Sequence, residues 1–200
     1  MGPNVWPAGD LLPTAKFREP CERYYEAITR LTLTVLSLLA RSLPYGPHIF
    51  DDFVSNTPAA PLRLLHYPPA PKGRTSKPQF GSSAHTDFGA ITLLMTDKNP
   101  GLEVYDALEK KWVAITPNPD AYVVNVGDML SKWTSDRYKS SLHRVVHTNP
   151  TDRYSVVFFF DGNLDCSLSA LDGSQREDEE GLTVEKHMIQ RMTHSYGKKD

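Results

Sequence analysis

The sequence predicts a mainly β fold, a sandwich or barrel of antiparallel strands with flanking helices. Short segments rich in β-branched and aromatic residues follow one another through the middle of the chain, as is typical of strands. Clusters of proline, glycine and asparagine separate these segments, at residues 68–73, 98–101, 116–119 and 148–151. Because short strands at regular spacing favour a sandwich or barrel, we expect one β core.

The length of 200 residues, with 40% hydrophobic content, is enough for one sizeable core, so we expect a single domain over 1–200. Residues 1–60 are a lead-in and a helix, residues 61–162 the strand-rich core, and residues 163–200 a loop and a helix. The first helix is predicted over 19–41 and the last over 183–196, from apolar residues at helical spacing. The apolar stripe of the first helix, which we expect to pack on the outside of a sheet, contains Tyr24, Ile28, Leu31, Val35 and Leu38.

Charge and composition exclude several functional classes. A net charge of −2 and a pI near 6.4 provide no basic surface for nucleic acid or for an anionic membrane. The longest apolar stretch, residues 31–40, is too short to span a bilayer. Two cysteines, Cys21 and Cys166, in a chain without a signal-like start favour a reducing compartment. We therefore expect a cytoplasmic protein.

The segment His85-Thr86-Asp87 carries the clearest chemistry in the chain. In an extended strand, residues two apart point to the same side, so His85 and Asp87 can reach one ion. His143 must then arrive from another strand. Two imidazoles and one carboxylate on one face of an octahedral ion leave three positions open, which suits Fe(II) and oxygen chemistry. A chance pair in a surface turn is the alternative for the first two residues taken alone.

Arg153 and Ser155 are also two apart, in a strongly β-forming run that ends at Phe160. They share one face of that predicted strand. A buried guanidinium requires an anionic partner. The alternative is an exposed arginine at a strand end, with Ser155 only filling space.

The remaining histidines do not complete a metal site. His147 would pair with His143 on a helix, but the valines between them favour a strand, where four residues span about 13 Å. His48, His66, His187 and His194 have no partner at ligand spacing. A hydrolase is disfavoured because Ser155 lacks a nucleophile-elbow context, and the acidic residues 51–52 and 177–180 are interpreted as loop charges.

These motifs occur in the order typical of one known family, and the chain resembles the isopenicillin N synthase-like family of Fe(II)- and 2-oxoglutarate-dependent dioxygenases. The similarity runs from about Leu62 to Phe160. The segments that carry it are 62–69, 84–94, 100–104, 111–113, 124–128, 141–145 and 153–155.

The resemblance implies a double-stranded β-helix, or jelly roll, with flanking α-helices. It implies that His85, Asp87 and His143 bind Fe(II), and that Arg153 and Ser155 hold the far carboxylate of 2-oxoglutarate. Tyr67 matches a tyrosine that often contacts this cosubstrate. The reaction would use O2 to hydroxylate or desaturate a small-molecule substrate, with release of succinate and CO2. For Phe88, Phe158 and Phe160, core packing is the favoured role and pocket lining the alternative.

Two alternatives stay open: an oxidase of the same fold that does not use 2-oxoglutarate, and a non-catalytic jelly-roll protein that binds metal. The ligand motif of relatives lies much further along the chain, so we expect a short member or a fragment. Apolar surface that relatives cover would then be exposed. We therefore expect self-association or a second polypeptide over the site.

Overall fold

The computed structural model describes residues 3–70, 80–146, 149–174 and 181–196. The chain divides into two compact units, Met1–Phe50 and Asp51–Asp200. The single domain expected from the length stays a prediction. Within the described ranges, no helix is long and apolar enough to cross a membrane.

The first unit contains the 3-10 helix η1 (Thr14–Lys16) and the long helix α1 (Arg18–Ser42), one residue longer at each end than predicted. The predicted apolar stripe is wrong in part, because Leu31 and Leu38 are exposed. The residues buried on α1 are instead four apart: Ile28, Thr32, Leu36 and Ala40. Thr32 is tolerated there because its hydroxyl donates to the Ile28 carbonyl at 2.9 Å.

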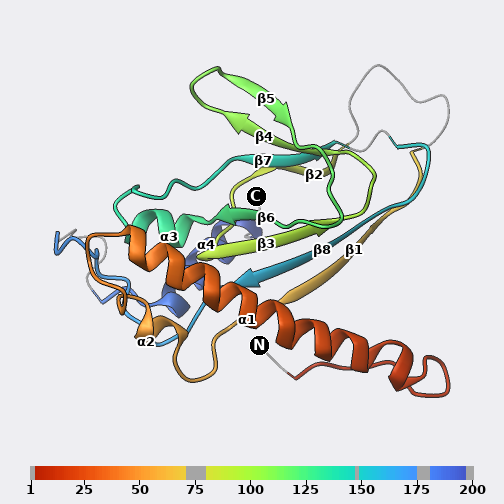
Figure 1. Cartoon of the computed structure of the whole chain (residues 1–200), viewed down its shortest axis with the longest axis horizontal. Helices are drawn as coiled ribbons and strands as arrows, with labels where there is room; N and C mark the ends of the chain where they lie inside the picture. Colours follow the sequence, from red (N-terminus) through yellow and green to blue (C-terminus); the bar gives the residue numbers. More distant parts are fainter. Residues whose placement is uncertain (1–2, 71–79, 147–148, 175–180, 197–200) are drawn as a thin grey trace. The chain divides into compact units, whose positions relative to one another are not determined.

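The second unit contains eight strands among its described residues, in two antiparallel sheets of four. The β8 sheet has the order β1-β8-β3-β6, with bounds Leu62–Tyr67, Arg153–Phe160, Ile91–Thr96 and Val123–Val126. The β7 sheet has the order β2-β7-β4-β5, with bounds Phe80–His85, His143–Val146, Leu102–Asp106 and Lys111–Ala114. Figure 1 shows the two sheets face to face. This arrangement confirms the predicted jelly roll.

Strand alternation divides the residues of β8 between two environments. Ser155, Val157 and Phe159 point between the sheets, where Val157 forms a buried apolar cluster with Leu94 of β3 and Leu102 of β4. Because this cluster lies between the sheets, the centre of that space is apolar. The intervening residues of β8 point to the opposite face of the β8 sheet.

The outer face of the β8 sheet is packed by aromatic residues from two short helices, α2 (Asp51–Val54) and α3 (Asp128–Trp133). The ring of Phe53 lies 5.3 Å from that of Trp133 and 5.8 Å from that of Phe160, measured between centroids. Gly162 allows this packing, since its φ is +79° and an added Cβ would lie 2.0 Å from the Phe53 ring. The acidic residues at 51–52 are thus the first turn of α2 and not a loop, a position that the helix dipole favours.

The last described helix, α4 (Val184–Tyr196), begins one residue after the predicted start. Its side chains reach the segment that follows β2. His187 Nε2 donates to the Phe88 carbonyl at 2.9 Å, and Arg191 forms an ion pair with Asp128 of α3. The helix therefore holds the segment that contains Asp87.

Candidate metal and cosubstrate site

The pairing of β2 with β7 brings two histidines together. His85, the last residue of β2, lies opposite His143, the first residue of β7. Asp87 lies beyond the end of β2, so the expectation that an extended strand carries both His85 and Asp87 is wrong for the aspartate. The strand ends because the chain turns at residues 88–90 before it enters β3.

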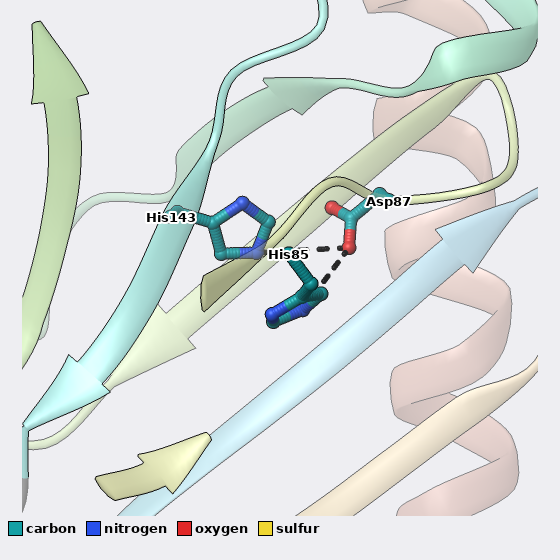
Figure 2. Close-up of side chains that lie close together, drawn as sticks. All are labelled: His85, Asp87 and His143. Carbon is teal, nitrogen blue, oxygen red and sulfur yellow. Dashed lines mark ion pairs between the residues drawn. The ribbon is translucent and has the colours of Figure 1, made fainter. Parts of the chain in front are cut away.

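The three side chains converge on one point between the two sheets (Figure 2). Asp87 Oδ1 lies 3.9 Å from His85 Nε2 and 3.7 Å from His143 Nε2. One nitrogen or oxygen atom from each residue lies within 4.8 Å of those of the other two. His143 and Asp87 are buried, whereas the side chain of His85 is 42% exposed. The group therefore has one open side.

Backbone carbonyls set the tautomer of both imidazoles. His85 Nδ1 lies 2.7 Å from the Ser83 carbonyl, and His143 Nδ1 lies 2.9 Å from the Ser141 carbonyl. A carbonyl oxygen only accepts, so each Nδ1 carries the proton. Each Nε2 then presents its lone pair toward Asp87, as a metal-binding histidine does.

The backbone of Asp87 is fixed by the start of α3. Its carbonyl accepts a hydrogen bond from the Asp128 amide at 2.8 Å. Gly127 permits this approach, because an added Cβ would lie 3.1 Å from the Asp87 carbonyl oxygen and 2.1 Å from that of Gly89. Thr86, which faces away from the site, donates to Asp128 Oδ2 at 2.9 Å. Asp128 was not singled out from the sequence, since its role depends on a contact with a residue 42 positions away.

Burial and charge raise the pKa of a second carboxyl behind the site. Desolvation and the nearby charge of Asp87 raise the pKa of Asp161 to about 7, and the positive charge of Arg63 opposes that shift. Asp161 lies against the turn after Asp87, where an added Cβ on Gly89 would meet Asp161 Oδ1 at 1.8 Å. No sequence motif singles out Asp161, which is simply the residue after the end of β8.

Arg153 begins β8 and is almost fully buried, with 1% of its surface exposed. Among the described residues, its Nε and Nη1 have no hydrogen-bond partner. Tyr67 lies opposite it in the pairing of β1 with β8, and the guanidinium carbon is 5.0 Å from the centre of the Tyr67 ring. Ser155 is buried on the same face of β8. The alternative of an exposed arginine at a strand end is therefore wrong.

All six residues singled out from the sequence line one cavity of about 110 Å³ between the sheets. They are Tyr67, His85, Asp87, His143, Arg153 and Ser155. Sequence reasoning did not single out the other residues that line the cavity, among them Arg63 of β1 and Phe159 of β8. Phe159 could have been found from alternation, because it shares the face of Arg153 and Ser155.

The three phenylalanines considered from the sequence do not line this cavity. Phe158 and Phe160 are fully buried on the opposite face of the β8 sheet. The Phe88 ring lies under the guanidinium of Arg191, whose carbon is 4.8 Å from the ring centroid. Core packing, the favoured role, fits Phe158 and Phe160, whereas Phe88 is half-buried against α4.

The other described histidines lie outside the group of three. His66 pairs with Asp152 at 2.6 Å and stacks on Tyr154. The pKa of His187 is lowered by burial, although its hydrogen bond to the Phe88 carbonyl opposes this. His66 and His187 therefore bind other protein groups and not a metal ion. His147 and the acidic run 177–180 lie outside the described residues.

Comparisons with known proteins agree with this geometry. A family model for the 2OG-Fe(II) oxygenase superfamily matches residues 58–162. The 2-oxoglutarate-dependent dioxygenase citB of Monascus ruber is 58% identical over 202 residues, which cover 100% of this chain and 61% of that protein. Clavatol oxidase claD of Penicillium crustosum is 47% identical, with 98% and 59% covered.

A solved structure matches as well. A full-length Neurospora crassa protein in complex with alpha-KG has a TM-score of 0.83 and 32% sequence identity, and the match covers 96% of this chain and 62% of that one. The same protein has been solved with alpha-KG and thymine together. The chain thus spans about three fifths of the length of the relatives it matches.

Proposed function

Because the chain belongs to the 2OG-Fe(II) oxygenase superfamily, we propose that it binds Fe(II) and 2-oxoglutarate and uses O2 to oxidise a small molecule. The observation that carries this proposal is the joint presence, in one cavity, of an open three-residue ligand group and a buried arginine with unpaired N–H groups. Members of this family act on small-molecule substrates with Fe(II), 2-oxoglutarate and O2.

The donor set fits a divalent iron. His85 and His143 each offer an Nε2 lone pair, and Asp87 offers Oδ1. The other oxygen of Asp87, Oδ2, is buried and has no hydrogen-bond partner among the described residues. A buried carboxylate without donors is costly unless a cation neutralises it. Three ligands of this kind also leave positions open for cosubstrate and oxygen.

The other end of the cavity fits a carboxylate. The Nε and Nη1 atoms of Arg153, which in the described chain are buried and unpaired, need an anion for the same reason that Asp87 needs a cation. Ser155 adds a hydroxyl donor on the same face, and the Tyr67 ring covers one face of the guanidinium. A molecule that bridges the two ends requires one carboxylate for Arg153 and oxygen ligands for the metal, as 2-oxoglutarate has.

In the proposed reaction, one oxygen atom of O2 enters the carboxylate of succinate as 2-oxoglutarate loses CO2. The other oxygen atom enters a C–H bond of the substrate as a hydroxyl group. Bound Fe(II) supplies the activation of O2. The protein residues orient the cosubstrate through Arg153 and Ser155, fix the ligand tautomers through backbone carbonyls, and exclude bulk water with the apolar centre of the cavity.

Anaerobic titration tests this proposal. Fe(II) is added first and 2-oxoglutarate second, and the visible charge-transfer band of an iron-chelated keto acid is recorded. The band is expected with 2-oxoglutarate and not with succinate. Iron binding without the band would favour an oxidase that does not use 2-oxoglutarate, and no iron binding would refute the ligand assignment.

We also propose, as finer points, a cytoplasmic location and self-association. Two unbridged cysteines support the first, and exposed Leu64, Val124 and Tyr154 on the β8 sheet support the second. Cell fractionation and light scattering test them. A monodisperse monomer would contradict self-association.

A further inference from the structure

Arg153 borders two cavities. The first is the cavity that contains the metal ligands, and the second, of about 130 Å³, contains none of them. Among the described residues, only Leu102 and Arg153 line both. Three residues in the wall of the second cavity, Thr116, Asn118 and Ala121, are exposed to solvent. The second cavity therefore has an opening of its own.

The Nε–H group of Arg153 lies on the side of the second cavity. A Cβ added to Gly101 would lie 3.4 Å from Arg153 Nε, and Gly101 lines the second cavity and not the first. Nε is buried and has no hydrogen-bond partner in the described chain. A buried donor of a charged group requires an acceptor.

One carboxylate does not satisfy the whole guanidinium of Arg153. A guanidinium has five N–H donors that point from different edges of its plane, and a bidentate carboxylate takes two of them along one edge. Both Nε and Nη1 are unpaired among the described residues. A cosubstrate carboxylate bound at the Nη end from the first cavity therefore leaves Nε for a second acceptor.

A hydroxyl group accompanies Arg153 in each cavity. Thr96 of β3 lies directly opposite Ser155 of β8, so their side chains are on the same face of the sheet. Ser155 lines the first cavity and Thr96 lines the second. The second cavity thus repeats the combination of guanidinium and hydroxyl that the proposed function assigns to a carboxylate.

The rest of the wall favours a small anion with an apolar part. Arg153 is the only charged residue among the described residues that line the second cavity, and Leu102, Ile115 and Val123 are apolar. The volume of about 130 Å³ is several times the roughly 10 to 15 Å³ that one water molecule requires. A carboxylate that carries one or two further carbons meets these conditions.

Asp97 is the nearby carboxylate of the protein itself, but other groups hold it. Burial raises the pKa of Asp97, whereas hydrogen bonds from Asn99 and Tyr154 and the charge of Arg153 lower it, and the lowering prevails. The Asp97 carboxylate accepts from the amide nitrogens of Asn99 and Tyr154 at 2.9 and 2.7 Å. Within the described ranges it forms no ion pair with Arg153, so Nε stays unpaired.

We propose that the second cavity binds a small carboxylate that shares Arg153 with 2-oxoglutarate, and that its binding weakens the cosubstrate. The effect on 2-oxoglutarate rests on the proposed function, whereas binding of the small carboxylate does not. Two carboxylates on one guanidinium repel each other. By thermodynamic linkage, each lowers the affinity for the other by the same factor.

Acetate and acetamide are matched probes, because they have nearly the same shape and only acetate is charged. The Nε–H signal of Arg153 is followed in ¹H–¹⁵N spectra of the metal-free protein at constant ionic strength, and is identified by its loss in Arg153→Lys. Acetate should shift this signal along a saturable curve, and acetamide should not. No saturable shift, or equal shifts with both probes, would overturn the proposal.

The same titration at rising 2-oxoglutarate concentration, with Zn(II) in place of iron, separates the two cavities. With two sites, the Kd of acetate should rise by about five- to tenfold and then level off. Competition for one site would make this Kd rise in proportion to 2-oxoglutarate without limit, which would refute a second site. If calorimetry shows no binding of 2-oxoglutarate, the proposed function fails, and substitutions in the second cavity still locate the acetate.

Two such substitutions are Ala121→Phe, which fills the exposed side of the second cavity, and Thr96→Val, which removes its hydroxyl. Ala121→Phe should prevent most acetate binding, while the affinity for 2-oxoglutarate without acetate stays within about twofold. Thr96→Val should weaken acetate by roughly tenfold or more, the effect of one lost hydrogen bond to a charged group.

Ala107→Phe is the matched control, because Ala107 lies on the exposed turn between β4 and β5 and lines neither cavity. It should leave the affinities for acetate and 2-oxoglutarate unchanged. Wild-type acetate binding in both Ala121→Phe and Thr96→Val would place the acetate elsewhere and overturn the proposal.

Discussion

Arg153 and Tyr67 lie directly opposite each other on β8 and β1, with the guanidinium carbon 5.0 Å from the centre of the phenol ring. The ring covers one face of a buried cation whose Nε and Nη1 have no protein partner in the described chain. A cation held by a ring face keeps its in-plane donors free. The pair is thus prepared for an anion that arrives from the cavity.

Arg153→Ala should weaken 2-oxoglutarate by roughly two to three and a half orders of magnitude, since loss of one partner of a buried charge pair costs about 3 to 5 kcal/mol. Arg153→Lys should recover only part of this affinity, because an ammonium group cannot make the two-pronged contact. Titration calorimetry with Mn(II) in place of iron measures both variants.

Ser155→Ala serves as the smaller change at the same end of the cavity. It removes one hydrogen bond to a charged group, about 1.5 to 3 kcal/mol, so its effect should be smaller than that of Arg153→Ala. Metal affinity should be unchanged in all three variants. If Arg153→Ala retained wild-type affinity for 2-oxoglutarate, the proposed anchor would be wrong.

Removal of any one metal ligand should abolish stable iron binding. His85→Ala, Asp87→Ala and His143→Ala each leave two donors, too few to hold Fe(II) in an open site. His66→Ala is the matched control, because its imidazole pairs with Asp152 and does not line the cavity. Equilibrium dialysis under anaerobic conditions measures the bound iron. Equal iron loss in His66→Ala would indicate general unfolding and not ligand loss.

Much of the site could be predicted because it depends on short local patterns. His85 with Asp87, and Arg153 with Ser155, are each two residues apart, so a strand or its immediate end places both members on one side. The chemistry of each pair indicates its ligand: the imidazole and carboxylate of His85 and Asp87 indicate a metal cation, and the guanidinium of Arg153 indicates an anion. His143 required the further assumption of a separate strand, which the family order of motifs supported.

The parts that could not be predicted depend on contacts between distant segments. Asp128 holds Thr86 and the Asp87 backbone only because α3 starts beside the turn after β2. The buried face of α1 includes Thr32, whose hydroxyl is satisfied by a hydrogen bond within the helix. Hydrophobicity alone therefore does not identify this face. Arg63 enters the site through the register of β1 against β8, which the sequence alone does not give.

Gly89→Ala should destabilise the protein and weaken metal binding. An added Cβ would lie 1.8 Å from Asp161 Oδ1, so either the buried Asp161 carboxyl or the turn that carries Asp87 must move. Overpacking of this kind costs about 1 to 3 kcal/mol of folding stability. Gly9→Ala is the control, since an added Cβ there meets nothing within 4 Å. Urea unfolding measures stability, and equal effects of the two substitutions would contradict the proposed contact.

Ionisation of Asp161 should lower the stability of the metal-free protein as the pH rises from about 4 to about 7. Burial and Asp87 raise the pKa of this carboxyl from 3.8 to about 7 in the folded state. The folded chain therefore binds more protons than the unfolded chain between these values, and stability falls with rising pH. The loss at pH 8 is at most about 4 kcal/mol, since each pKa unit corresponds to about 1.4 kcal/mol.

Asp161→Asn should remove this dependence while it keeps the shape of the side chain. The variant should match the wild type near pH 4 and exceed its free energy of unfolding at pH 8, as measured by urea unfolding in the presence of a chelator. His187 titrates in the opposite sense, because burial lowers its pKa, but it is present in both proteins and cancels in the difference. Asp87→Asn should reduce the dependence in part, since the Asp87 charge contributes to the raised pKa. Parallel stability curves for Asp161→Asn and the wild type would show that Asp161 is ionised in the folded protein and that its burial is compensated.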